Sequence, residues 1–381
     1  MKMRNIKLLL LSATVGISPI ALSIDANATT TADVKQTVAQ DVSYFTPRPK
    51  LDTRLDFSAW DYMLSESVLY MGPSTRRPAP RKSASVGSRL ATGNKSRLRL
   101  EGNKILYPLM NSYVKSEFIA YKDELIALGN TYDIPSLPKN EQLAYWINLH
   151  NAVVVSTIID AYPGPKRQPT LIKPVKGSDA TLHDAKLINI KDYALSLRDI
   201  REKIVFPNWR NKDVPFAFHL GYQSSPSLSN TAYEGRTIDM QLARNAYEFF
   251  NSLRAYEKGT LNPYIVEVSE WYFPNMDVDF ETYMQRKMRP EVFAEFSVNG
   301  IIKIGKRDLS IADMTAGHGT RLFASNLQTS SRSRSALGPE IDDFLTARAI
   351  KFQKLEEKEW YRRGTVTIED TPTDDEVEKT Y

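Results

Sequence analysis

The segment from Asn140 to Ile159 constrains the fold of this chain more than any other stretch. It contains no glycine or proline, it follows Pro138, and Asn140 is a candidate N-cap with Glu141 in the first turn. These signals predict a helix. Because no face of this helix is fully polar, it is predicted to be buried at the centre of the fold.

Four polar side chains lie in this apolar segment, namely Glu141, Asn148, His150 and Asn151. An unpaired buried polar group costs about 1–3 kcal/mol, so each of them requires a partner. Either they tie down the backbone of neighbouring loops, or they line a binding site together with Trp146. For Glu141 a third role is a favourable charge at the positive end of the helix dipole.

The first 28 residues have the pattern of a secretory signal peptide. Lys2, Arg4 and Lys7 precede an apolar run that begins with four leucines, and Ala26 to Ala28 forms an A-x-A cleavage pattern. We therefore expect cleavage after Ala28 and a periplasmic or secreted protein. No later stretch approaches the roughly 20 apolar residues of a membrane-spanning helix, so we expect no transmembrane anchor after signal removal.

Composition excludes several kinds of chemistry. The 381 residues include no cysteine, which rules out disulfides, thiol catalysis and cysteine-ligated metals. The four histidines are widely spaced, and nucleotide-binding and serine-hydrolase motifs are absent, so we expect no cofactor and no metal. A net charge of +5 is mild, and we expect no nucleic-acid partner.

The chain is divided into six predicted regions. They are the signal peptide (1–28), a flexible lead-in (29–56), an N-terminal helix with a basic loop (57–106), a core domain (107–273), a C-terminal extension (274–365) and an acidic disordered tail (366–381). The basic loop, residues 72–100, contains eight lysines and arginines and no acidic residue. It is interpreted as a solvated insertion, with an arm for an anionic partner as the alternative.

The remaining elements follow from hydrophobic periodicity. Helices are predicted at 57–71, 107–128, 196–205, 237–253, 280–296 and 341–363, the last as a charged surface helix. Strands are predicted at 187–190, 214–220, 264–271 and 301–304, with Asn299 and Gly300 favouring a hairpin before the last one. The pattern as a whole predicts an α+β protein with a buried central helix, a small antiparallel sheet and flanking helices.

Several short strings resemble the family called domain of unknown function 547. They are N-E-Q-L-A-Y-W-I-N-L-H-N, S-L-R-D-I, V-P-F-A-F-H-L-G-Y-Q-S-S-P-S-L, A-Y-E-G and V-S-E-W-Y. The resemblance covers roughly residues 107–273. Many members of that family have a histidine at the start of the third string and an S-C-P turn after it. The resemblance therefore implies a papain-like arrangement with a thiol nucleophile and a histidine base.

This chain departs from the family pattern at both positions. Pro215 stands where the histidine would be, and Ser225 stands where the cysteine would be. Serine without a neighbouring base is a weak nucleophile. His219 and His150 are candidate bases for Ser225, and either Asn148 or Asn151 could orient an imidazole. Alternatively, these side chains are buried in the core with hydrogen-bond partners of their own, and the serines only form a turn.

Two functions therefore remain open. The first is a non-catalytic binding or scaffolding protein of the cell envelope. A peptide, glycan or protein ligand would then lie between the central helix and the 224–226 turn, near Asn148, Asn151, Trp146, Gln223, Ser224 and Glu141. The second is a hydrolase of peptide or amide bonds that uses Ser225 with His219 or His150. It requires a histidine nitrogen within hydrogen-bond reach of Ser225 Oγ, and main-chain amides beside it.

Overall fold

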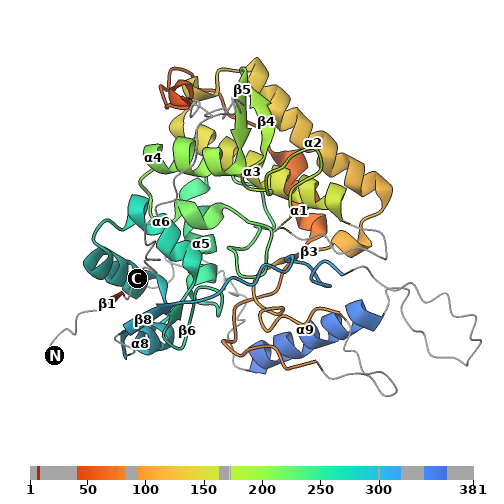
Figure 1. Cartoon of the computed structure of the whole chain (residues 1–381), viewed down its shortest axis with the longest axis vertical. Coiled ribbons are helices and arrows are strands. Elements are labelled where there is room, and N and C mark those ends of the chain that lie inside the picture. The colour runs from red at the N-terminus through yellow and green to blue at the C-terminus, as the bar shows by residue number, and fades with distance from the viewer. Residues whose placement is uncertain are drawn as a thin grey trace, which may run out of the picture.

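The structure is a computed structural model that describes residues 7–8, 41–82, 93–162, 171, 173–298, 301–318 and 339–357. Helices dominate this part of the chain and the strands are short, so the α+β prediction is confirmed (Figure 1). The predicted acidic tail and most of the predicted signal peptide lie outside the described residues.

The α-helices of the described residues are α1 (Ser58–Ser67), α2 (Ser112–Thr131), α3 (Lys139–Ala161), α4 (Phe206–Asn208), α5 (Ile238–Phe250), α6 (Pro263–Tyr272), α7 (Glu281–Lys287), α8 (Pro290–Val298) and α9 (Pro339–Glu357). Short 3-10 turns occupy Ser43–Phe45, Tyr107–Leu109, Ile134–Ser136 and Val214–Ala217. Asp199–Val205 and Met276–Phe280 are π-helical.

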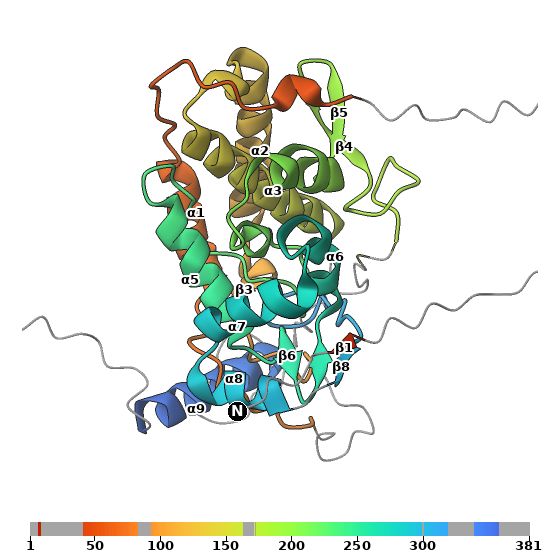
Figure 2. The same cartoon turned by 90° about the vertical axis from the view of Figure 1, so that its left-hand side faces the viewer.

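The strands form one mixed sheet and two antiparallel two-stranded sheets. The mixed sheet has the order β1 (Lys7–Leu8), β8 (Ile301–Ile304), β7 (Thr260–Leu261), β6 (Tyr256–Glu257), and only β6 and β7 are antiparallel. The antiparallel pairs are β2 (Val68–Leu69) with β3 (Lys104–Ile105), and β4 (Lys186–Ile190) with β5 (Tyr193–Ser196). Figure 2 shows β4 and β5 with α2 and α3 at one end of the molecule, and β6, β8, α8 and α9 at the other.

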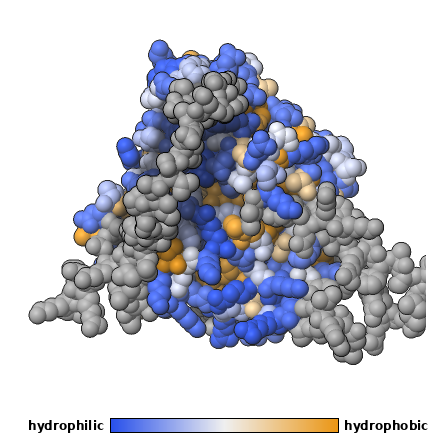
Figure 3. All heavy atoms as spheres, viewed as in Figure 1, coloured by the Kyte–Doolittle hydropathy of each residue, from blue (hydrophilic) through white to orange (hydrophobic). Residues whose placement is uncertain are grey.

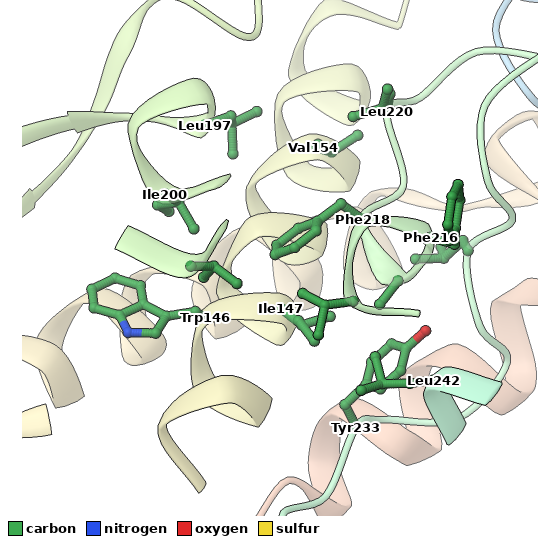
Figure 4. Packing of buried hydrophobic residues seen from close by; sticks show 14 of the residues in the cluster. Trp146, Ile147, Val154, Leu197, Ile200, Phe216, Phe218, Leu220, Tyr233 and Leu242 are labelled. Carbon is green, nitrogen blue, oxygen red and sulfur yellow. The ribbon is translucent and has the colours of Figure 1, made fainter. Parts of the chain in front are cut away.

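The central helix α3 is buried as predicted. It runs two residues beyond the predicted segment at its C-terminal end, and Pro138 rather than Asn140 precedes its first turn. Nearly every residue from Glu141 to Ile159 is buried, on all sides of the helix. Figure 4 shows Trp146, Ile147 and Val154 of α3 packed among side chains of the following segments, including Ile200, Phe218 and Leu220.

Two of the predicted strands are wrong. Val214–Ala217 is a 3-10 turn followed by extended chain, and Phe216, Ala217 and Phe218 are all buried, so no solvent face exists to produce alternation. The segment 264–271 lies in helix α6, where the side chain of Asn262 accepts a hydrogen bond from Tyr264 N and Pro263 occupies the first turn. The buried positions Tyr264, Ile265, Val268 and Tyr272 have helical spacing, which the strand interpretation overlooked.

The hairpin prediction before β8 is also wrong, because β8 is parallel to both of its neighbours. Asn299 and Gly300 themselves lie outside the described residues. Helix α9 is less superficial than predicted, since Ile341 and Phe344 pack with Met71 and Met314 in a second small core. The N-cap predicted at Ser196 is confirmed, because Ser196 Oγ accepts a hydrogen bond from Asp199 N.

The described part of the basic loop is not a solvated insertion. Arg76 Nη2 donates to Glu295 and to the carbonyl of Tyr256, and Arg97 forms an ion pair with Glu257. Arg99 is buried and donates to the carbonyl of Pro80. Arg76 and Arg97 therefore fix the loop to the C-terminal half of the chain, and Arg99 holds two parts of the loop together.

The segment 305–318, here called the C-terminal strap, crosses the predicted core domain. Gln223 N donates to Ser310 O and Ser224 N to Asp308 O, while Ala312 N donates to Gly221 O. The predicted C-terminal extension therefore supplies backbone partners to the segment that contains Ser225. No helix among the described residues is long and apolar enough to cross a membrane.

Helices α2 and α3 approach each other closely at Gly129. A Cβ at this position would lie 2.3 Å from Tyr145 Oη and 3.0 Å from Ile190 Cδ1. We expect Gly129→Ala to destabilise the protein, because an overpacking cost of about 1–3 kcal/mol exceeds the gain of about 1 kcal/mol in helix propensity. Urea denaturation measures the difference. Ala120→Gly, at an exposed site of the same helix, isolates the propensity effect; a stabilised Gly129→Ala variant would contradict the close packing.

Candidate functional site

The two central asparagines hold loop backbone against α3. Asn148 Nδ2 donates to Tyr233 O at 2.8 Å, and Tyr233 N donates to Asn148 Oδ1 at 3.0 Å. Asn151 Nδ2 donates to Ala217 O, and Asn151 Oδ1 accepts from His219 N. Both amides are therefore fully engaged by main-chain groups, and this corresponds to the structural alternative for these residues.

The other predicted binding residues are also buried in structural contacts. Gln223 Nε2 donates to Ile311 O, and Ser224 Oγ accepts from Asp308 N, so both residues hold the C-terminal strap. Glu141 Oε2 accepts from Leu55 N in the first turn of α3. The Trp146 ring packs edge-on against Phe45 and Tyr145. All of these residues are buried, and their polar groups in the region between α3 and the 224–226 turn bind the protein's own main chain.

Ser225 and His219 do lie next to each other, with Ser225 Oγ 3.4 Å from His219 Nδ1. However, His219 Nδ1 is 2.9 Å from Pro226 O, and a carbonyl oxygen can only accept, so Nδ1 carries the proton. Ser225 Oγ in turn donates to Tyr222 O at 2.7 Å. The imidazole nitrogen beside the hydroxyl is therefore a donor and not a base.

Among the described residues, the main-chain amides on either side of Ser225 are not free to stabilise an oxyanion. Ser225 N donates to Tyr222 O, Ser224 N is engaged by Asp308 O, and Pro226 has no N–H. Arg254 Nη1 donates to Ser225 O at 2.8 Å, while its Nη2 pairs with Glu248. With Ser225 only 1% exposed, the turn is a closed structural feature.

The second candidate base, His150, faces Arg201 rather than Ser225. Arg201 Nη1 donates to His150 Nε2 at 2.9 Å and to His183 Nδ1 at 3.3 Å. Since a guanidinium has no acceptor, both imidazole nitrogens accept, and both rings are neutral. The opposite nitrogens agree with this assignment, because His150 Nδ1 is 3.2 Å from Asn151 Oδ1 and His183 Nε2 is 3.1 Å from Leu220 O.

Burial lowers the pKa of all three histidines. The pKa of His219 falls to about 4 and that of His183 to about 3, and that of His150 also lies well below its usual value. The positive charge of Arg201 adds to this effect at His150 and His183. The three imidazoles are therefore neutral in the folded protein at physiological pH.

Arg201 and His183 line an open pocket of about 590 Å³. Apolar side chains of Phe206, Leu220 and Trp271 contribute to its wall, as do the two phenols Tyr222 and Tyr264. Figure 3 shows the face drawn in Figure 1, which is hollowed near its middle and has hydrophilic and hydrophobic residues side by side there. Of the residues predicted to form a site, none is among those that line this pocket.

Sequence reasoning therefore missed Arg201, although one signal was available. Leu197, Ile200 and Ile204 form the buried face of the 196–205 helical segment, and Arg201 lies beside them instead of on the polar side. A charged residue on the apolar face of a short helix requires a partner. Groups of three or more potential metal ligands were not found among the described residues.

Residues 134–250 match the model of a family described as "Protein of unknown function, DUF547". This part of the chain is therefore similar to that family. The matched region includes α3, Arg201, His219 and Ser225, and it lies within the predicted core region. No curated protein and no solved structure matches the chain. The papain-like arrangement that the resemblance implied remains a prediction.

The Asn148 contacts lead to a stability prediction. We expect Asn148→Ala to lower the free energy of unfolding by about 1–3 kcal/mol, because the N–H and C=O of Tyr233 lose their buried partners. Chemical denaturation provides the measurement. Asn208→Ala is a matched control, since Asn208 Nδ2 bonds only a carbonyl of its own helical segment. An unchanged midpoint for Asn148→Ala would show that Asn148 does not hold this loop.

The buried histidines lead to a pH prediction. Each has a folded-state pKa below the usual 6.5, so the unfolded chain binds more protons and stability is lost as pH falls from 6.5 towards 4. Asp313 has the opposite effect on stability, because burial raises its pKa to about 6. This single group offsets only part of the effect of the three buried histidines. We expect a loss of about 1.4 kcal/mol per pH unit for each histidine that titrates. For His183→Gln, the plot of the free energy of unfolding against pH should have a slope that is smaller by the contribution of one proton. A slope equal to that of the wild type would contradict this assignment.

Proposed function

We propose that this protein is an exported, non-catalytic binding module of the cell envelope. Its ligand occupies the pocket lined by His183, Arg201 and Tyr264, rather than the region around Ser225. The observation that carries the proposal is the 2.9 Å distance from His219 Nδ1 to Pro226 O. Because the carbonyl can only accept, this contact requires the proton on Nδ1 and leaves Ser225 without a base.

The hydrogen bonds around Ser225 support a structural role for this residue. A serine nucleophile must transfer its proton to an acceptor as it attacks, and the best placed acceptor of the Ser225 proton is the carbonyl of Tyr222. A carbonyl oxygen is far too weak a base for this purpose. The hydroxyl instead closes the turn that joins the buried 214–220 segment to Leu228.

The pocket supports binding by its composition. Ligand sites are concave, largely apolar, and contain a few polar groups that orient the ligand. The Arg201 pocket combines aromatic and aliphatic walls with one buried guanidinium, and its volume of about 590 Å³ suits a small molecule or a short peptide segment. Export is supported by the basic start, apolar run and A-x-A pattern of residues 1–28.

A hydrolase is the second candidate, and one observation favours it. Ser225 Oγ and His219 Nδ1 are within 3.4 Å, as a serine–histidine pair would require. Catalysis would need the His219 proton to move to the other ring nitrogen and the hydroxyl to leave Tyr222 O. It would also need an open path to a serine that is now buried.

A serine-directed fluorophosphonate distinguishes the two functions. We expect no labelling of the native protein, because Ser225 is buried and has no base. We also expect Ser225→Ala to fold and to retain the biological activity, with a stability loss of about 1 kcal/mol from the hydrogen bond to Tyr222 O. Mass spectrometry of the intact protein reads out the labelling. Labelling that is abolished in Ser225→Ala would replace the binding function with a serine hydrolase.

A further inference from the structure

Arg201 has an incomplete set of hydrogen bonds. Its side chain is 6% exposed, and both of its hydrogen bonds within the described part of the chain leave from Nη1, to His150 and His183. The nearest carboxylate oxygen, Glu202 Oε1, lies 4.0 Å from Nη2. The Nε and Nη2 groups therefore have no hydrogen-bond acceptor among the described residues.

The two groups without acceptors are the pair that binds carboxylates side-on. In a guanidinium, the N–H bonds of Nε and Nη2 point the same way and are spaced to meet the two oxygens of one carboxylate. Nη1, on the other side, is already used by the imidazoles. A buried cation whose partners are neutral is costly to maintain, and an incoming anion would offset that cost.

The other charged groups of the pocket are arranged differently. Arg198 pairs with Asp184 at 2.6 Å and with Glu202 at 3.2 Å, and Arg307 pairs with Glu267. Glu267 and Glu270 are exposed, so water screens them from the buried guanidinium. Arg201 is thus the one cation of the lining that lacks a hydrogen-bonded carboxylate among the described residues.

We propose that the Arg201 pocket binds a small carboxylate with an apolar or aromatic body, the carboxylate pairing side-on with Arg201 Nε and Nη2. The apolar body lies against Phe206, Leu220 and Trp271, which line the same pocket. The four acidic side chains of the lining, against three arginines, favour a singly charged carboxylate over a doubly charged phosphate. This assignment rests on the proposed binding function and names its ligand class.

Three probes test the assignment by isothermal titration calorimetry on the full chain. They are 3-phenylpropanoate, its neutral amide 3-phenylpropanamide, and phenyl phosphate. We expect the carboxylate to bind about tenfold to a hundredfold more tightly than the amide, the range of a charge-assisted hydrogen-bond pair, and more tightly than the phosphate. Equal affinity for acid and amide, tighter binding of the phosphate, or no binding of any probe would overturn it.

Two variants locate the binding. Arg201→Lys keeps the charge but loses the planar pair of donors, and we expect it to bind 3-phenylpropanoate at least about tenfold more weakly. Arg48→Lys, in an exposed ion pair with Asp133 outside the pocket, is expected to bind as the wild type does. Circular dichroism shows whether Arg201→Lys folds. If it does not fold, the affinities of the wild type for 3-phenylpropanoate and 3-phenylpropanamide still test the proposal.

The outcome is separate from that of the proposed function. Fluorophosphonate labelling of Ser225 would disprove the non-catalytic function whatever the pocket binds. Equal binding of acid and amide would leave a non-catalytic binding pocket in place and remove only the carboxylate. An unchanged affinity in Arg201→Lys would show that the carboxylate is held by another group and would also overturn the assignment.

Discussion

The structure depends on one constraint, which is that a helix buried on all sides must satisfy its polar side chains internally. Asn148 and Asn151 meet this requirement by binding the backbone of Tyr233, Ala217 and His219. Because Tyr233 and His219 lie outside the helices and strands and Ala217 ends a short 3-10 turn, the asparagines supply backbone hydrogen bonds that regular secondary structure does not supply there. The irregular chain around Ser225 is therefore ordered by α3 from one side and by the C-terminal strap from the other.

The same constraint produces the unusual state of Arg201. His150 is buried on α3 and offers a neutral nitrogen, and His183 offers a second, so the guanidinium is held by two imidazoles that it helps to keep neutral. Glu202 Oε1 lies 4.0 Å from Nη2, beyond hydrogen-bond distance, whereas a carboxylate hydrogen-bonded to Nε and Nη2 would have occupied both donors. The two imidazoles hold Arg201 at the wall of a pocket through Nη1, and Nε and Nη2 have no hydrogen-bond acceptor among the described residues. The proposed carboxylate site rests on this pair of donors.

The Ser225 turn shows why proximity alone does not identify catalysis. The serine and histidine that the sequence suggested do lie side by side. The direction of their hydrogen bonds, set by the carbonyls of Tyr222 and Pro226, gives both groups the role of donor. Such directions depend on where main-chain carbonyls point after folding, and no spacing of residue types in the sequence contains that information.

The sequence by itself determined the central helix, the α+β class, the amphipathic helix α5 and the N-cap at Ser196, because these depend on local periodicity and capping. It also indicated the resemblance to the DUF547 family through its short motifs. Segment 214–220 was misjudged because alternation of apolar residues predicts a strand only where one face meets solvent, and tertiary burial removed that condition. Segment 264–271 was misjudged for another reason, since its buried positions have helical spacing and follow the Asn262 cap and Pro263. Only the tertiary structure decided which buried polar groups found partners, because Arg201, His150 and His183 come from separate segments whose meeting is set by packing and not by chain order.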